Sequence, residues 1–184
     1  MDGPCVRDMG LMFTTRMTVV KLRGGSLWVN SPVSVSSDTL KRITELGPVR
    51  HLLAATPRHV WRLAAWHNLI SRSRAMDSAD YPTDSEKSAA ARPRILADNP
   101  PQCWAADFDQ VAFKGNPLIE EVVFFHKGSR TVILGDLVQS HSMVKGEPFR
   151  NTLLKLEGVA SPHGGVGLEI RLFFVNRNVA RKSL

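Results

Sequence analysis

Cysteine is scarce in this chain of 184 residues, where only Cys5 and Cys103 occur. Neither belongs to a C-x-x-C pair or a Cys/His ladder, which excludes a disulfide framework and a zinc finger. Two distant thiols are typical of a reducing compartment, so we expect a cytoplasmic protein. Cys103 stands beside Trp104, and we predict a buried small side chain there rather than a nucleophile.

Long apolar runs are also missing. The longest candidates, residues 122–125 and 172–175, fall far short of the roughly 18 residues that a membrane-spanning helix needs. Residues 1–17 contain no continuous hydrophobic stretch before a small-residue cleavage site, so a secretion signal is not expected. This segment also lacks a strand or helix pattern, and we predict a poorly ordered leader. The sequence therefore favours a protein without a membrane partner.

Several functional motifs are absent. Lys plus Arg number 24 against 17 Asp plus Glu, a net charge of +7, yet no RNA-binding signature or zinc-finger spacing accompanies the basic residues. Nucleic acid is therefore not an expected partner. The chain has no phosphate-binding loop and no G-x-S-x-G elbow, and His163-Gly164-Gly165 is interpreted as a flexible connection between two helices.

The patterning that is present predicts a mixed α/β protein. Hydrophobic residues make up 43% of the chain and charged residues 22%, which suits one globular domain over residues 18–184. Periodicity and turn residues predict strands at 18–22, 27–29, 49–55, 109–113, 121–126 and 131–134, and helices at 37–46, 56–71, 149–156 and from 168 onwards. Residues 71–94 are polar and lack periodicity, so they are predicted to form an inserted surface loop.

Two stretches carry a resemblance to a known family. They are LWVNSPVSVSSDTLKRITELGPVRHLLAATPRH and DFDQVAFKGNPLIEEVVFFHKGSRTVILGDLVQSH. They resemble a bacterial family classed as a domain of unknown function, which is itself similar to the metallo-β-lactamase superfamily. The resemblance covers roughly residues 18–182. It implies an αββα sandwich of two β-sheets between helices, incomplete at the C-terminus because the final strand and its histidine would lie beyond the chain.

The metal motif of that superfamily is degenerate here. Its members bind zinc or iron through H-x-H-x-D-H after a strand, a later His after a Gly, an Asp closing a strand and a final His. In the matching segment His59 remains, while Pro57, Trp61 and Arg62 stand where ligands would be. None of these three side chains coordinates a divalent cation. Asn116 replaces the later His and offers only a neutral amide oxygen.

Asp136 matches the aspartate of the motif, at the end of the strand predicted at 131–134. The resemblance makes Asp136 and His59 the candidate catalytic residues, and His59, Asp136 and His141 the candidate ligands of one divalent metal, with zinc as the expected ion. A strand-end Asp also commonly caps the backbone amides of its loop, which is the alternative role for Asp136. His126 ends the neighbouring strand and could join a His/Asp cluster, or be an exposed turn histidine.

Two function classes follow. The first is a hydrolase of small esters or lactones with a reduced or lost metal site, in which a metal-bound water would attack the substrate. The second is a non-catalytic relative that keeps the scaffold for binding or assembly and self-associates through an exposed sheet edge. On either reading we expect a homo-oligomer, with a dimer as the simplest state.

Overall fold

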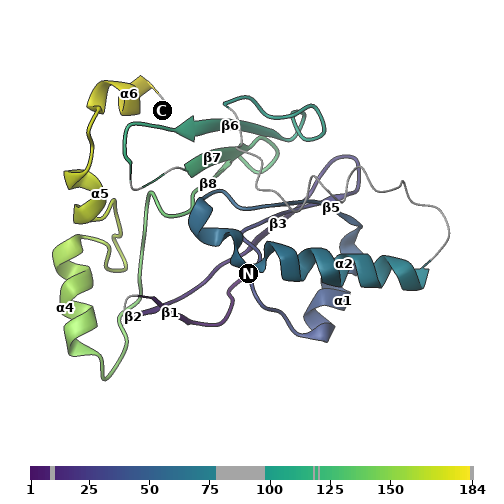
Figure 1. Ribbon diagram of the computed structural model, residues 1–184, viewed down its shortest axis with the longest axis horizontal. Coiled ribbons are helices and arrows are strands. Elements are labelled where there is room, and N and C mark those ends of the chain that lie inside the picture. The colour runs from purple at the N-terminus through teal and green to yellow at the C-terminus, as the bar shows by residue number, and fades with distance from the viewer. Residues whose placement is uncertain (9–10, 78–97, 118, 120, 183–184) are drawn as a thin grey trace. The chain divides into compact units, whose positions relative to one another are not determined.

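The computed structural model describes residues 1–8, 11–77, 98–117, 119 and 121–182. Contacts within the chain define two compact units (Figure 1). Unit 1 comprises residues 1–4 and 15–96, and unit 2 comprises residues 5–14 and 97–184. Helices and sheets are both present, so the chain has the mixed α/β structure that the sequence predicts. The sequence indicated one domain over residues 18–184, whereas the contacts form two units.

Unit 1 contains a three-stranded sheet in the order β3-β4-β5. Strand β3 (Thr18–Lys21) and strand β4 (Leu27–Asn30) agree with two predicted strands and form an antiparallel hairpin. Strand β5 (Val49–Leu53) lies parallel to β4, so that Asn30 pairs with Leu53 at the carboxyl ends of both strands. All four residues of β4 are buried, as expected for the central strand of a sheet.

Helix α1 (Ser37–Leu46) connects the two parallel strands, as a crossover of this kind requires. Its bounds agree with the sequence prediction because both ends carry strong signals. The Ser36 side chain accepts a hydrogen bond from the Thr39 amide. At the other end, Gly47 adopts φ 154°, and a Cβ there would lie 2.3 Å from the carbonyl oxygen of Gly25, so only glycine fits this close approach.

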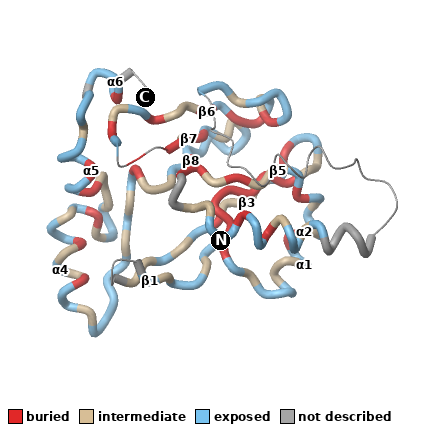
Figure 2. Tube along the Cα trace, in the orientation of Figure 1, coloured by how far each residue is buried: buried red, intermediate tan, exposed pale blue. Residues whose placement is uncertain are grey.

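The core of unit 1 is apolar and centres on the sheet (Figure 2). The indole N–H of buried Trp66 donates to the Val33 carbonyl at 2.7 Å, which satisfies the polar atom of a large core side chain. The buried members of the core are Met17, Leu27, Val29, Val33, Ile43, Val49 and Trp66.

The helix predicted over 56–71 differs from the structure at both ends. A 3₁₀ helix, η1 (Pro57–Arg62), comes first, and helix α2 (Leu63–Asp77) follows. Pro at a first helical position fits both helix types, so the sequence signal did not separate them. Helix α2 also occupies the start of the predicted 71–94 insertion, and the remainder of that insertion lies outside the described residues.

Unit 2 contains another three-stranded sheet, in the order β6-β7-β8, and this sheet is antiparallel throughout. Its strands are β6 (Phe108–Phe113), β7 (Glu121–His126) and β8 (Thr131–Ile133), which agree with the three predicted strands. The register pairs Phe113 with Glu121, placing Glu121 at the first position of β7. Because β8 runs antiparallel to β7, the chain that follows β8 returns to the level of Glu121.

Residues 1–17, where we expected a poorly ordered leader, contribute structure to both units. In unit 2, strand β1 (Val6–Asp8) pairs with strand β2 (Leu11–Phe13) as an antiparallel hairpin. In unit 1, the terminal amino group of Met1 donates to the carbonyl of Met17 at 2.8 Å, and Met17 is fully buried. The short apolar runs of this segment were too weak a pattern to reveal the hairpin.

Three helices follow the second sheet. Helix α4 (Pro148–Glu157) matches its prediction and ends at Gly158, in the left-handed conformation that favours glycine. The continuous helix predicted from residue 168 is wrong: α5 (Leu168–Leu172) ends at Phe173 and α6 (Arg177–Lys182) begins separately. The described part of the chain contains no helix that is long and apolar enough to cross a membrane.

Candidate functional site

A polar cluster forms where β4 and β5 end in unit 1, and we call it the strand-end cluster. The Asn30 side-chain oxygen accepts from the Ala55 amide at 2.9 Å and from the Ser31 hydroxyl at 3.2 Å. The Ser31 hydroxyl lies 2.9 Å from Nδ1 of His59, in η1. Because the Ser31 amide also donates to the Leu53 carbonyl, these contacts hold the segment after β5 against the end of β4.

Ser31 has the position but not the surroundings of a catalytic serine. It is 8% exposed and adopts φ 55°, a strained conformation common at functional sites. Pro32 follows, however, and proline has no backbone N–H to donate to an oxyanion. The strand-end cluster thus joins β4 to the segment after β5, and its histidine is held by the serine hydroxyl.

Glu121 is the central polar residue of unit 2, and we call its contacts the Glu121 clamp. Its side chain is only 2% exposed. One carboxylate oxygen accepts from the Gly135 amide at 2.5 Å, and the other accepts from the amides of Asp136 and Leu137 at 2.6 and 2.7 Å. Glu121 therefore caps the loop after β8 and fixes the position of Asp136.

Burial raises the pKa of Glu121, because the charged carboxylate loses its water. The three backbone N–H donors oppose this shift by stabilising the charged form, and the nearby Asp136 carboxylate adds to it. The net direction is upward from an ordinary value of 4.5. The protonation state of the buried Glu121 side chain therefore depends on the backbone N–H groups of the loop that it caps.

His141 comes after the same loop, and its contact with Gln139 shows which ring nitrogen carries the hydrogen. The Gln139 amide nitrogen donates to the Asp136 carbonyl at 3.0 Å, so the Gln139 oxygen faces His141 Nε2 at 2.9 Å. Since an amide oxygen only accepts, Nε2 carries the hydrogen and Nδ1 carries the lone pair. Within the described part of the chain, Nδ1 is buried without a hydrogen-bond partner. The ring also makes an edge contact with Phe13 at 5.3 Å between centroids.

Burial lowers the pKa of His141, and the neighbouring Arg150 guanidinium lowers it further. The Asp136 carboxylate acts in the opposite direction. Because the pKa lies below the ordinary value of 6.5, the imidazole is neutral at neutral pH. A neutral Nδ1 lone pair is able to accept a proton or a hydrogen bond.

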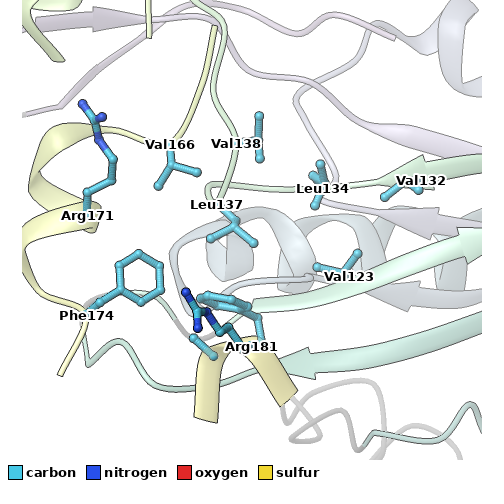
Figure 3. Close-up of a pocket in the computed structure, with 11 residues that line it drawn as sticks. Val123, Val132, Leu134, Leu137, Val138, Val166, Arg171, Phe174 and Arg181 are labelled. Atoms are coloured by element: carbon cyan, nitrogen blue, oxygen red, sulfur yellow. The ribbon is translucent and has the colours of Figure 1, made fainter. Parts of the chain in front are cut away.

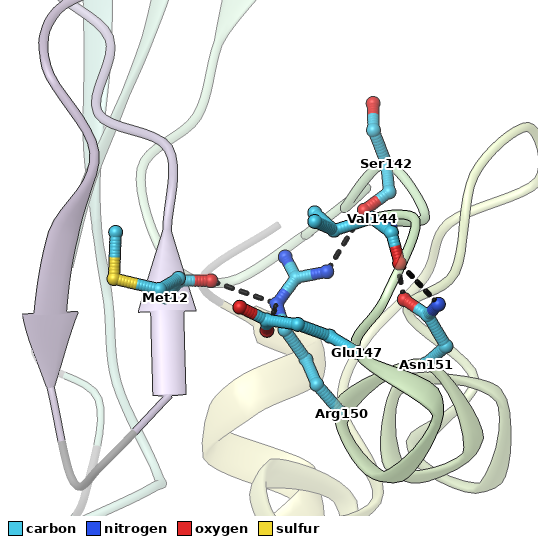
Figure 4. A network of polar contacts seen from close by, with 6 residues as sticks. All are labelled: Met12, Ser142, Val144, Glu147, Arg150 and Asn151. Atoms are coloured by element: carbon cyan, nitrogen blue, oxygen red, sulfur yellow. Dashed lines mark hydrogen bonds and ion pairs between the residues drawn. The ribbon is translucent and has the colours of Figure 1, made fainter.

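Arg150, in α4, links the helix to the N-terminal hairpin (Figure 4). It is 4% exposed, and its guanidinium donates to the carbonyls of Met12 at 2.8 Å and Ser142 at 3.0 Å. The carboxylate of Glu147, at the N-cap of this helix, lies 3.9 Å from the guanidinium. A buried guanidinium needs such acceptors, so Arg150 holds β2 and the loop after His141 in place.

Unit 2 also contains an apolar pocket of about 630 Å³ (Figure 3). Nine of its eleven lining residues are hydrophobic, and the other two are Arg171 and Arg181. The apolar lining comes from β6, β7 and β8, the loop after β8, the segments on either side of α5, and α6. This volume is within the range of pockets for small organic ligands.

The residues predicted to share one metal are divided between the units. His59 belongs to unit 1, whereas Asp136 and His141 belong to unit 2. Within the ranges that the structure describes, no group of three or more His, Cys, Asp or Glu side chains could hold a metal ion. Both oxygens of Glu121 already accept amide hydrogens, so this acid does not complete a set with its neighbours. Of the three candidate donors, unit 2 by itself contains Asp136 and His141.

The structure also places three other residues that the sequence analysis singled out. Asn116 is buried, and its amide nitrogen donates to the Ile170 carbonyl at 2.7 Å. His126 accepts from the Ser129 amide at 3.2 Å in the turn between β7 and β8, so the turn interpretation of this histidine is the one supported. Cys103 is exposed, which corrects the prediction of a buried thiol.

Sequence reasoning missed Glu121 and Arg150. Glu121 caps the loop that contains Asp136, and it accepts a hydrogen bond from the Asp136 amide. A charged residue at the start of a strand usually faces water, so Glu121 carried no signal in the sequence. Arg150 occupied a polar position in a predicted helix, and its acceptor Met12 lies 138 positions away along the chain.

Comparisons with protein-family models and with curated proteins found no match to this chain.

Proposed function

We propose that this chain is a non-catalytic binding protein built on a scaffold similar to the metallo-β-lactamase-like hydrolases. The resemblance of residues 18–182 supports an αββα arrangement. One observation carries the binding role: side chains that a hydrolase would use already hold the fold together. His59 contacts Ser31, His141 contacts Gln139, and the loop of Asp136 is capped by Glu121.

The test is a comparison of hydrolysis with metal content. The full chain, purified after growth with zinc, is assayed against p-nitrophenyl esters and aliphatic lactones. We expect no turnover above that of heat-denatured protein, and less than one equivalent of zinc by elemental analysis. Turnover that disappears in Asp136→Ala at an unchanged melting temperature would overturn the proposal.

A second candidate, hydrolysis of a small ester or lactone, is favoured by the buried lone pair of His141. Its lowered pKa keeps Nδ1 unprotonated at neutral pH. As a general base, Nδ1 would take a proton from a water whose oxygen attacks the carbonyl carbon. The ester C–O bond would then break, and the imidazolium would return the proton to the departing alkoxide, giving an acid and an alcohol. A rate that falls in His141→Gln, together with an acid limb of the pH–rate profile below pH 6.5, would support this candidate.

For assembly we propose a homodimer formed by pairing of β8 with the β8 of a second copy. Strand β8 pairs with β7 on one side and is an end strand of its sheet within the described residues, so the backbone groups of its other edge can pair with a second strand. Light scattering is expected to give a dimer. A wild-type monomer at tens of micromolar would contradict the proposal.

A further inference from the structure

The apolar pocket of unit 2 combines a hydrocarbon-like interior with positive charge. We infer that it binds an unbranched alkyl carboxylic acid, with the chain among the apolar side chains and the carboxylate on Arg181. This inference rests on the proposed binding function and names its ligand class.

The alkyl part of the ligand follows from the lining. Val123 and Val132 enter from β7 and β8, Leu134 and Leu137 from the loop after β8, and Phe174 from the segment after α5. Among the lining residues none is a Ser, Thr, Asn, Gln or His that could recognise the hydroxyls of a sugar or the edge of a base. Transfer of an alkyl chain from water into such surroundings is favourable in proportion to the area buried.

The acidic group of the ligand is inferred from the charged residues of the lining. Arg171 and Arg181 are both in the lining, which contains no Asp or Glu. Figure 3 shows Arg181 beside the apolar side chains, near Leu137 and Phe174, and Arg171 at the margin. In contrast to Arg150, whose guanidinium reaches two carbonyls, Arg181 has no hydrogen bond or ion pair within the described residues. A guanidinium whose N–H groups have no acceptor among these residues is suited to a bidentate bond with a carboxylate.

The size of the pocket sets an upper limit on the ligand. A volume of about 630 Å³ accommodates a chain of moderate length but not a macromolecule. Inorganic phosphate would meet the arginines but leave the apolar lining exposed to water. An alkyl acid satisfies both halves of the pocket at once.

The first experiment is calorimetric titration of the full chain with fatty acids of six to fourteen carbons, each below its micelle concentration. Affinity is expected to rise about fourfold per added methylene until the pocket is full. The alcohol and the amine of equal chain length serve as matched probes. They should bind at least tenfold more weakly, because neither carries the negative charge that pairs with Arg181. Equal binding of acid and alcohol would contradict the charge assignment.

Variants locate the site. Arg181→Gln should weaken acid binding at least tenfold and leave alcohol binding unchanged, whereas Lys145→Gln removes the same charge outside the lining and should change neither. Val138→Trp introduces bulk at a lining residue that is 43% exposed, and should abolish binding of every probe. Val175→Trp, at a residue that is 79% exposed and outside the lining, is its control. Melting curves verify that each variant is folded.

The outcomes separate this inference from the proposed function. If decanoate binds and p-nitrophenyl decanoate is hydrolysed in an Asp136-dependent manner, the pocket assignment holds and the non-catalytic role fails. If no alkyl acid binds, or if Arg181→Gln binds as wild type does, the pocket assignment is overturned whatever the hydrolysis assay gives.

Discussion

The strand-end cluster of unit 1 and the Glu121 clamp of unit 2 both join a strand to a following loop, but by different chemistry. Asn30, Ser31 and His59 interact through side chains that need carry no charge. Glu121 instead brings a carboxyl group into the interior and satisfies it with three backbone amides. Neutral contacts each contribute modestly, whereas loss of a buried acceptor leaves several donors unsatisfied. The clamp should therefore be the more sensitive of the two.

The largest effect is expected for Glu121→Ala. Removal of the carboxyl group leaves the amides of Gly135, Asp136 and Leu137 without their acceptor, and we expect a loss of about 3 kcal/mol in unfolding free energy. Urea denaturation measures it. The control is Asp109→Ala, which removes an exposed carboxylate that pairs with Lys127, and should cost less than about 0.5 kcal/mol. Equal effects of the two changes would contradict the role of the clamp.

Arg150→Met should come next, at about 2 kcal/mol. Methionine keeps much of the apolar stem but leaves the carbonyls of Met12 and Ser142 without their donor. The matched control is Lys155→Met on the same helix, where the side chain is exposed. Protection of the hairpin amides in hydrogen exchange should fall in Arg150→Met alone, and unchanged protection would show that Arg150 does not hold β2.

In unit 1, Asn30→Ala should cost about 1 to 2 kcal/mol, because the buried Ala55 amide loses its acceptor. Thermal unfolding measures the change. Ser31→Gly should leave the unfolding free energy nearly unchanged. The contact with His59 is lost, at a cost of roughly 1 kcal/mol, but relief of the backbone strain at φ 55° restores about as much. A loss in Ser31→Gly as large as that of Asn30→Ala would mean that the serine hydroxyl dominates the cluster.

The smallest effect is a pH dependence that belongs to the clamp. Because the folded pKa of Glu121 is raised, its stabilising contribution is full below the ordinary value of 4.5 and is lost as pH rises through the folded pKa. The unfolding free energy of wild type relative to Glu121→Gln should therefore decrease as pH increases from about 4.5. If the unfolding free energies of the two proteins changed in parallel with pH, the raised pKa of Glu121 would be contradicted.

The pH dependence of stability that His141 contributes has the opposite sign. Its folded pKa is lowered, so its contribution is present above 6.5 and is lost as pH falls through the folded value. An NMR titration of the ring protons should give a midpoint below 6.5 in wild type. In Arg150→Met the midpoint should move upward, since the nearby positive charge is removed. A midpoint unaffected by Arg150 would contradict the electrostatic contact.

Local signals in the sequence were sufficient for most elements. Helix α1 could be placed because Ser36 and Gly47 mark both of its ends, and the strands of both sheets could be placed from β-branched runs between turns. The break at Phe173 was missed because its surroundings keep helical spacing. Glu121 and Arg150 were missed because their burial depends on partners that only the folded chain brings close.

Residues 1–17 also bear on how this protein can be produced. A product whose translation started at Met17 would lack the hairpin β1-β2 and with it the Met12 carbonyl that accepts from Arg150. The same product would lose the pairing of Asp2 with Arg16 in unit 1. One choice of start codon thus alters two units of the protein, and an expression plasmid trimmed to the first predicted strand would encode a chain with a buried guanidinium short of one acceptor.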